Sequence, residues 1–246
     1  MDVINNLLKI DTKNNMGITG ITDEFFCVYL VNLLNQKKQN ILVVVNSLYE
    51  ANKLYSSIQN YTDSCYLFPM DDFLTSEALV ISPDLEFNRL ETINNIISGN
   101  GNIVITNLMG YLRYLPTKKN YQQFFVDIKL NEEINPQKLV EKLVSSGYVR
   151  DSIVDKTGEF AVRGFIIDVF PIGEDNPVRI EFFGDFIDSI RYFDVNSQKS
   201  LSSINNILIK PCTEFLSIKT VNESHFKKQK YLPYYETVTN LSLIHI

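Results

Sequence analysis

The chain has 246 residues, of which 45% are hydrophobic and 21% are charged, so it can form one large domain or two to three small ones. Its 23 basic and 29 acidic side chains give a formal net charge of -6. This balance argues against a protein whose main function is to bind nucleic acid, because phosphate binding requires a concentrated positive field.

The cysteines and histidines do not suggest a metal centre. Cys27, Cys65 and Cys212 lie far apart, and the chain has two histidines, His225 and His245, so no zinc site is expected. Cys27 and Cys65 lie within apolar stretches and are predicted to be buried, reduced thiols without a redox role. We therefore expect neither a metal nor another cofactor.

The sequence also shows no membrane segment. No stretch approaches the roughly 18 uninterrupted apolar residues of a membrane span. Residues 1–6 lack the positive flank and apolar core of a signal peptide. These features predict a soluble, cytoplasmic protein without a membrane partner.

Over the first 115 residues, helical patterns alternate with short, apolar, β-branched runs. The predicted elements are helices over 24–35, 47–61, 85–98 and 108–115, and strands over 41–45, 65–68 and 102–106. Ser47 and Glu50 are predicted to form a capping box, and Gly99 to end the third helix. Continuously apolar strands are typical of parallel sheets covered on both faces. The alternation predicts a three-layer α/β unit.

The pattern changes after Pro116. The polar segment 118–123 is predicted to be a link, followed by a strand over 125–130. A helix is predicted over 135–146, with Asn135 as its cap. Residues 148–208 contain strands and turns, with turn signals at 156–158, 173–177, 184–185 and 196–197. This combination predicts one helix packed on an antiparallel sheet, an α+β domain inserted in or following the first unit.

The last stretch, 214–246, resumes the pattern of the first unit without completing it. The apolar tail 241–246 has no partner in view, so we expect the reading frame to continue beyond Ile246. The expected domains are therefore 1–118 for the α/β domain, 119–209 for the inserted α+β domain and 210–246 for a truncated return to the first.

A glycine-containing loop precedes the first helix, with Gly17 and Gly20 followed by Asp23 and Glu24. A phosphate-binding loop needs Lys and Ser or Thr where these two carboxylates stand. Carboxylates at this point repel phosphate but favour the first turn of a helix. We interpret the segment as a turn leading into a capped helix, with the outline of a phosphate loop but not its function.

The run 178–183 alternates along a predicted strand. Period two places Val178, Ile180 and Phe182 on one face and Arg179, Glu181 and Phe183 on the other. If the first set is buried, Phe183 lies beside Arg179 on an exposed face, and Arg163 lies on a neighbouring strand. Arginine and aromatic side chains dominate protein–protein hot spots. The alternative is a solvated Arg–Glu ladder between strands.

Several aspartates lie in this region without a histidine or nucleophile beside them. They are Asp168, Asp185, Asp188 and Asp194. They occupy turns and alternate strand positions, and Asp185 follows Gly184 in a turn. We expect no catalytic residue among them.

The stretch 147–201 is very similar to the UvrB-interaction module of transcription-repair coupling factors. The matching runs are GY at 147–148, GEFAVRG at 158–164, IDVFP at 167–171, PVRIEFFGD at 177–185 and SIRYFD at 189–194. Upstream, PMDD at 69–72 and DLEFNRL at 84–90 resemble the first domain of the family. The resemblance covers about residues 15–215.

The resemblance implies the fold of the N-terminal region of UvrB, a helicase-like α/β domain with an inserted α+β domain. In the family the inserted domain binds UvrA, which brings nucleotide excision repair to RNA polymerase stalled at a DNA lesion. The family's UvrA-contacting positions correspond to Arg163, Arg179 and Phe183. This region is then no enzyme, whereas the full-length family is an ATP-dependent DNA translocase whose polymerase- and DNA-binding parts would follow residue 246.

UvrB itself, the ATP-dependent damage-verification subunit, is the alternative within this resemblance. It would carry an intact phosphate loop and an aromatic-rich hairpin that enters damaged DNA. Asp23 and Glu24 depart from that loop and favour a coupling factor without ATPase activity in this region. A third possibility is a clamp that packs on the motor of the longer protein and masks the UvrA surface.

Overall fold

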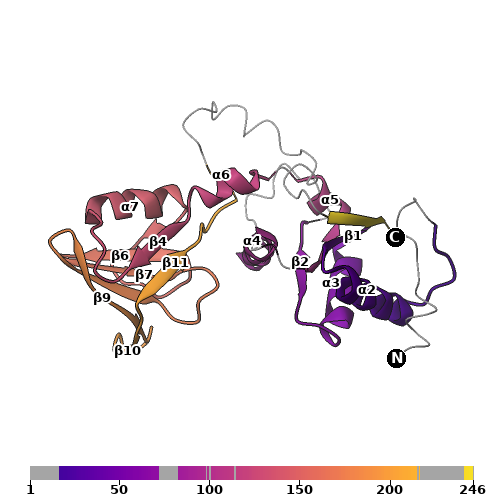
Figure 1. Cartoon of the computed structure of the whole chain (residues 1–246), viewed down its shortest axis with the longest axis horizontal. Coiled ribbons are helices and arrows are strands. Elements are labelled where there is room, and N and C mark those ends of the chain that lie inside the picture. The colour runs from indigo at the N-terminus through magenta and orange to yellow at the C-terminus, as the bar shows by residue number, and fades with distance from the viewer. Residues whose placement is uncertain are drawn as a thin grey trace. The chain divides into compact units, whose positions relative to one another are not determined.

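The computed structural model describes residues 17–71, 83–97, 99, 101–113, 115–214, 216 and 241–245. It divides into two units, Met1–Tyr114 with Tyr231–Ile246, and Leu115–Lys230 (Figure 1). The segment 1–6, Ser98, His225 and most of the stretch 214–246 lie outside the described residues. Within the described ranges, no helix is long and apolar enough to span a membrane.

The first unit contains a parallel sheet. Its strands are β1 (Asn40–Val45), β2 (Cys65–Phe68), β3 (Ile103–Asn107) and β12 (Leu241–His245), in the order β12-β1-β3-β2. Its helices are α2 (Asp23–Lys37), α3 (Leu48–Gln59), α4 (Pro83–Ile97) and α5 (Leu108–Tyr111). Because α3 and α4 link consecutive parallel strands, the β–α alternation read from the sequence is confirmed.

Both faces of this sheet are covered. Ile41, Val43 and Val45 pack in one core cluster with buried side chains of α2 and α3. On the other side, α4 packs on β2, where the Oγ1 of Thr92 donates a hydrogen bond of 2.7 Å to the carbonyl of Leu67 (Figure 1). Every residue of β1 is buried. The predicted three-layer α/β architecture is therefore confirmed.

The helix caps and ends observed in this unit agree with those predicted from the sequence, with small differences. The Oγ of Ser47 accepts a hydrogen bond of 3.2 Å from the N–H of Glu50, as predicted. The Glu50 carboxylate, however, accepts from the N–H of Asn46 at 3.0 Å, one residue before the cap. The predicted helix over 108–115 ends already at Tyr111. Gly110 favours helix weakly and Pro116 disfavours helical backbone just before it, which leaves too short a stretch.

The C-terminal apolar tail was wrongly expected to lack a partner. Leu241–His245 forms strand β12, which pairs in parallel with β1 from Asn40 to Val44. The edge of β1 offers free backbone groups, and an apolar run of this length can pair with them from a distant point in the chain.

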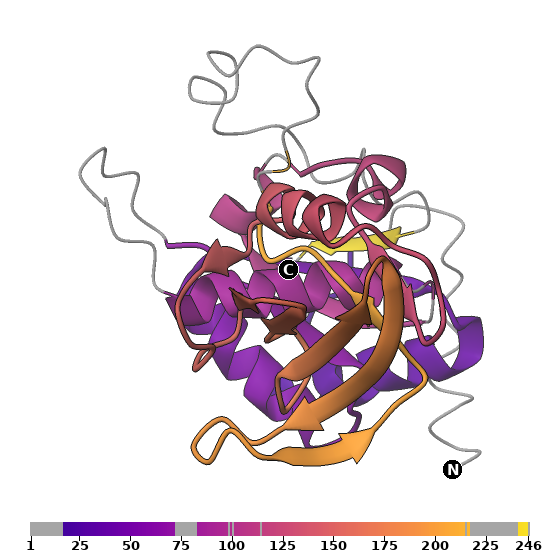
Figure 2. The ribbon, with the colours of Figure 1, turned by 90° about the vertical axis from the view of Figure 1, so that its left-hand side faces the viewer.

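In its described residues, 115–214 and 216, the second unit contains two sheets and two helices. A six-stranded sheet runs in sequence order through β5 (Val149–Arg150), β6 (Glu159–Arg163), β7 (Ile166–Val169), β8 (Val178–Phe183), β9 (Phe186–Phe193) and β10 (Ser200–Ser203). β4 (Val126–Lys129) and β11 (Asn206–Ile209) form a two-stranded sheet, and the helices are α6 (Lys118–Gln122) and α7 (Pro136–Ser145). Figure 2 faces this unit and shows the strong twist of its orange strands. All pairs are antiparallel as predicted, except that β5 runs parallel to β6.

The main core of this unit lies on one face of the six-stranded sheet, and a smaller buried cluster of Val154, Ala161 and Phe193 lies on the other. Val178, Ile180 and Phe182 of β8 are buried in the main core, as the alternation predicts. Leu139 and Leu143 of α7 and the buried side chains of β4 and β11 complete the same cluster. We call this side the core face. Asn135 caps α7 as predicted, because its side chain accepts from the N–H groups of residues 137 and 138.

The segment 118–123 is not a link, as was predicted, but forms the short helix α6. Thr117 caps this helix by accepting from the N–H of Asn120. Tyr121 is fully buried, and its hydroxyl donates to the carbonyl of Pro211 at 3.4 Å. A helix that buries one side chain among polar neighbours gives no apolar stripe in the sequence, which explains the error.

Thiol reactivity provides a test of the first unit. Cys27 and Cys65 are both buried in its core, as predicted, and burial raises the pKa of the Cys65 thiol to about 12. We expect Cys65 to resist alkylation by iodoacetamide near pH 8, where an ordinary thiol of pKa ~8.5 reacts as its thiolate. Mass spectrometry should find it modified only after denaturation; rapid modification in the folded chain would contradict this core.

Candidate protein-binding site

The face of the six-stranded sheet opposite the core carries the predicted site residues. Burial alternates along β8, so Arg179, Glu181 and Phe183 share one side, as predicted, and Phe183 is 81% exposed. The register and alternation of the neighbouring strands add the side chains of Glu159, Ala161, Arg163, Ile166, Asp168, Phe186, Ser189, Arg191 and Phe193. We call this side the outer face.

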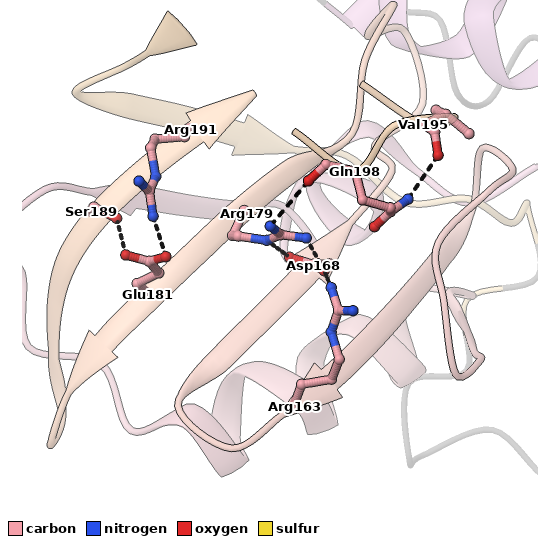
Figure 3. A network of polar contacts seen from close by, with 8 residues as sticks. All are labelled: Arg163, Asp168, Arg179, Glu181, Ser189, Arg191, Val195 and Gln198. Carbon is pink, nitrogen blue, oxygen red and sulfur yellow. Dashed lines mark hydrogen bonds and ion pairs between the residues drawn. The ribbon is translucent and has the colours of Figure 1, made fainter. Parts of the chain in front are cut away.

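A buried aspartate lies at the centre of the outer face. The side chain of Asp168 is 1% exposed, and its residue is paired across the strands with Arg179. The Arg179 guanidinium binds both carboxylate oxygens, with Nε to Oδ1 at 2.7 Å and Nη2 to Oδ2 at 3.0 Å. Arg163 also donates from Nη2 to Oδ2 (Figure 3). One carboxylate therefore fixes the positions of both predicted arginines.

Arg179 is less accessible than the sequence suggested. Its side chain is only 15% exposed, its guanidinium lies 4.6 Å from the centre of the Phe193 ring, and its Nη1 points to the carbonyl of Gln198. The hydrogen bonds to Asp168 raise the pKa of Arg179 above its ordinary value. The prediction of its face was right, but the prediction that it lies exposed beside Phe183 was wrong. A periodicity assigns a side chain to a face and does not reveal what covers it.

Arg163 is the accessible arginine of the predicted trio. Its side chain is 43% exposed, although its guanidinium is held by the buried Asp168. It lies at the end of β6, where Gly164 and Phe165 form the turn into β7. Arg163 can therefore present a positive charge to another protein from a fixed position.

The alternative of an Arg–Glu ladder is correct for another part of the outer face. Arg191 donates from Nη2 to Glu181, and the Oγ of Ser189 donates to the same carboxylate at 2.8 Å (Figure 3). The two charged side chains are 32% and 30% exposed. The ladder joins β8 and β9, and the Asp168 cluster joins β6, β7 and β8, so the ladder interpretation applies to the β8–β9 part of this face.

Asp168 was missed as a site residue. The sequence interpretation placed it among aspartates in turns and alternate strand positions. It lies in the apolar run of β7, and the hairpin pairing places it opposite Arg179. The signal that could have revealed it is a single carboxylate on a buried strand facing an arginine across a hairpin.

The other aspartates have local roles. Asp185 lies in the turn with Gly184, whose φ is +65°, and Asp188 lies at the register shift between the Glu181 and Phe182 pairs. The Asp194 carboxylate accepts two hydrogen bonds of 2.7 Å from Ser197. In the part of the chain that the structure describes, no three His, Cys, Asp or Glu side chains are grouped to hold a metal ion.

The glycine-containing loop leads into α2 as a capped turn, as interpreted from the sequence. The Oγ1 of Thr22 accepts from the N–H of Phe25 at 3.3 Å, and Asp23 and Glu24 occupy the first turn. Asp23 also forms an exposed ion pair of 2.7 Å with Lys53 of α3. The mouth of this helix thus presents carboxylates where a phosphate loop would present a cation.

Replacing Asp168 tests its central place on the outer face. Asp168→Asn should lower the free energy of unfolding by about 2–3 kcal/mol, below the full effect of breaking a buried ion pair, because the amide oxygen still accepts and Arg163 is partly solvated. Urea denaturation followed by circular dichroism measures the change. The matched control is Asp185→Asn in the exposed turn, which should leave the midpoint unchanged. Equal midpoints for both variants would contradict the assignment.

The second unit and most of the chain are similar to known proteins. The profile of the UvrB interaction domain matches residues 126–215, which contain β4 to β11. A transcription-repair-coupling factor of Staphylococcus aureus (strain MRSA252) is 32% identical over 250 residues, covering 96% of this chain and 21% of that protein. The same protein of Bacillus subtilis (strain 168) is 32% identical over 201 residues, covering 81% of this chain and 17% of that protein.

The chain thus spans about a fifth of the length of the curated relatives that it matches. Its second unit carries the UvrB interaction domain, and its first unit is the parallel α/β domain described above. Over the stretch that it spans, the chain is similar to transcription-repair-coupling factors, and residues 126–215 match the UvrB interaction domain.

Proposed function

We propose that this chain is a docking module that recruits UvrA through the outer face, at Arg163, Arg179 and Phe183. Recruitment would bring nucleotide excision repair to RNA polymerase stalled at a DNA lesion. The similarity to transcription-repair-coupling factors and the UvrB interaction domain support a role in repair, and the outer face supplies the chemistry.

The exposure of Phe183 on the same face of the sheet as Arg163, whose guanidinium Asp168 holds, carries the proposal. Phe183 is 81% exposed on a sheet whose other face already contains the core. Exposed aromatic and arginine side chains together are the typical anchors of protein interfaces. Because Asp168 holds the Arg163 guanidinium before binding, less side-chain entropy is lost when a partner binds.

In this proposal Arg179 contributes mainly through the cluster. Its guanidinium is largely buried between Asp168 and Phe193, so its removal would disturb the face as well as any contact. Arg163 and Phe183 are therefore the cleaner positions for testing binding.

Alanine substitutions at these two positions test UvrA recruitment. Arg163→Ala and Phe183→Ala should each weaken binding to immobilised, purified UvrA by about 2 kcal/mol, roughly 30-fold, because each removes an exposed anchor. Surface plasmon resonance measures the affinity. Val144→Ala, at a 57% exposed position of α7, is the matched control and should bind as the unaltered chain does. Unchanged affinity of both variants would end the proposal.

The alternative function is nucleotide-dependent DNA processing, as in UvrB. The glycines Gly17 and Gly20 ahead of α2 are the observation that favours it. We propose instead that this chain binds no nucleotide, since Asp23 and Glu24 stand at the mouth of the helix and Asp23 already pairs with Lys53.

A titration with labelled ATP and Mg²⁺ distinguishes the two functions. The signal should stay flat for this chain, while a phosphate-loop ATPase measured under the same conditions should saturate. Saturable binding by this chain, lost on adding unlabelled ATP, would favour the UvrB-like alternative.

For the longer protein we propose a cytoplasmic coupling factor. Contacts with RNA polymerase and DNA, and ATP-driven translocation, would belong to parts outside these 246 residues. There the outer face could also be masked against the motor, and binding assays with the whole protein and with this chain would then give different UvrA affinities.

A further inference from the structure

Residues 210–213 directly follow β11, and we call them the strap. The chain continues from β11 towards α6 (Figure 1). Ile209, the last residue of β11, is fully buried in the main core. In the strap, Pro211 is buried, the other side chains are half-buried, and Cys212 packs against the main core as a partly buried side chain. The strap therefore buries less apolar surface than β11 does, and its hydrogen bonds decide how firmly it is held.

Two buried tyrosine hydroxyls bind the backbone of the strap. The hydroxyl of Tyr148 donates to the carbonyl of Lys210 at 2.8 Å, and the hydroxyl of Tyr121 donates to the carbonyl of Pro211 at 3.4 Å. Tyr148 is 3% exposed and Tyr121 is fully buried, so bulk water does not compete for these bonds. Burial raises the pKa of both hydroxyls above the ordinary value, so both remain protonated donors at physiological pH.

The backbone at the end of α7 approaches the strap closely. The N–H of Cys212 donates to the carbonyl of Ser146 at 2.8 Å. The next residue, Gly147, has a φ of +92°, and a Cβ atom there would lie 2.6 Å from the Cγ2 of Thr213. Glycine at this position therefore leaves the room that the strap occupies.

These contacts connect the strap to the start of the second unit. Tyr121 lies on α6, and the Oγ of Ser146 donates to the carbonyl of Phe124, two residues beyond that helix, at 3.0 Å. Ser146 thus binds the segment after α6 through its side chain and the strap through its carbonyl. The chain after β11 is held against the start of the same unit by a small set of polar contacts.

We propose that the strap opens locally, leaving Tyr121 and Tyr148 while the six-stranded sheet stays folded. When it is closed, the strap ties the chain after β11 to the start of the second unit. When it is open, that chain is released while Ile209 stays in the core. Segments with few buried apolar contacts are those that open at a lower free energy than the whole domain. The proposal does not depend on UvrA recruitment.

Amide hydrogen exchange in the whole chain, followed by NMR, tests local opening. The N–H of Cys212 should be protected at least roughly tenfold less than the N–H of Ile180, because opening the strap requires less free energy than unfolding the sheet. Ile180 is the reference, since its strand β8 is paired on both sides. Equal protection of the two groups would mean that the strap opens only together with the sheet, and would overturn the proposal.

Removing a hydroxyl tests what holds the strap. Tyr148→Phe should speed exchange at Cys212 about fivefold relative to Ile180, because one hydrogen bond to the strap is lost. Tyr121→Phe should have a smaller effect in the same direction, since its bond is longer.

Tyr192→Phe is the matched control. It removes a hydroxyl that donates to the Glu174 carboxylate at 2.7 Å, in the same unit but away from the strap. The exchange rate of Cys212 relative to Ile180 should stay as in the unaltered chain. The proposal fails if Tyr148→Phe also leaves this ratio unchanged, or if Tyr192→Phe raises it equally.

Discussion

The ion pairs of the buried Asp168 hold the outer face together. A carboxylate with 1% exposure is stable only when paired, because moving one ion out of water costs several kcal/mol. Arg179 supplies the inner, bidentate partner and Arg163 the outer one. Their attraction roughly offsets the desolvation of the three groups, so the cluster adds little net stability and mainly fixes geometry. The exposed end of Arg163 is positioned as a result.

Because these ion pairs hold Arg163 in the folded chain, its side chain is already ordered before a partner binds. A free arginine on a surface has many rotamers, and ordering it on binding costs about 0.5–1.5 kcal/mol. Here Asp168 already holds the Arg163 guanidinium within the folded chain. The ion pair of Asp23 and Lys53 in the first unit differs, because both side chains are well exposed and such pairs contribute little. The pair matters because it leaves the Asp23 carboxylate beside the glycine-containing loop, where a phosphate-binding loop would carry a cation.

Local features of the sequence predicted much of the fold. The apolar run of β1, the caps Ser47 and Asn135, and the alternation from Val178 to Phe183 depend on nearby residues, and all agree with the structure. The face of Arg179 and Phe183 followed from the same alternation, although their role in binding stays a proposal.

The errors share a different cause. The apolar run of β12 does not reveal its partner β1 at the far end of the chain, and α6, which buries only Tyr121, leaves no apolar stripe. The burial of Arg179 depends on Asp168 and Phe193, which come from two other strands. Contacts between distant residues decide these features, and a single sequence does not display such contacts.

The most direct test of the account is whether UvrA, the proposed partner, touches the outer face of the second unit. A photo-crosslinking amino acid can replace Phe183 on the outer face or, in a separate chain, Val144 on α7, both of which are exposed. Illumination with purified UvrA should give a covalent adduct from position 183 and none from position 144. An adduct from position 144 alone would show that UvrA binds elsewhere and would contradict the central claim.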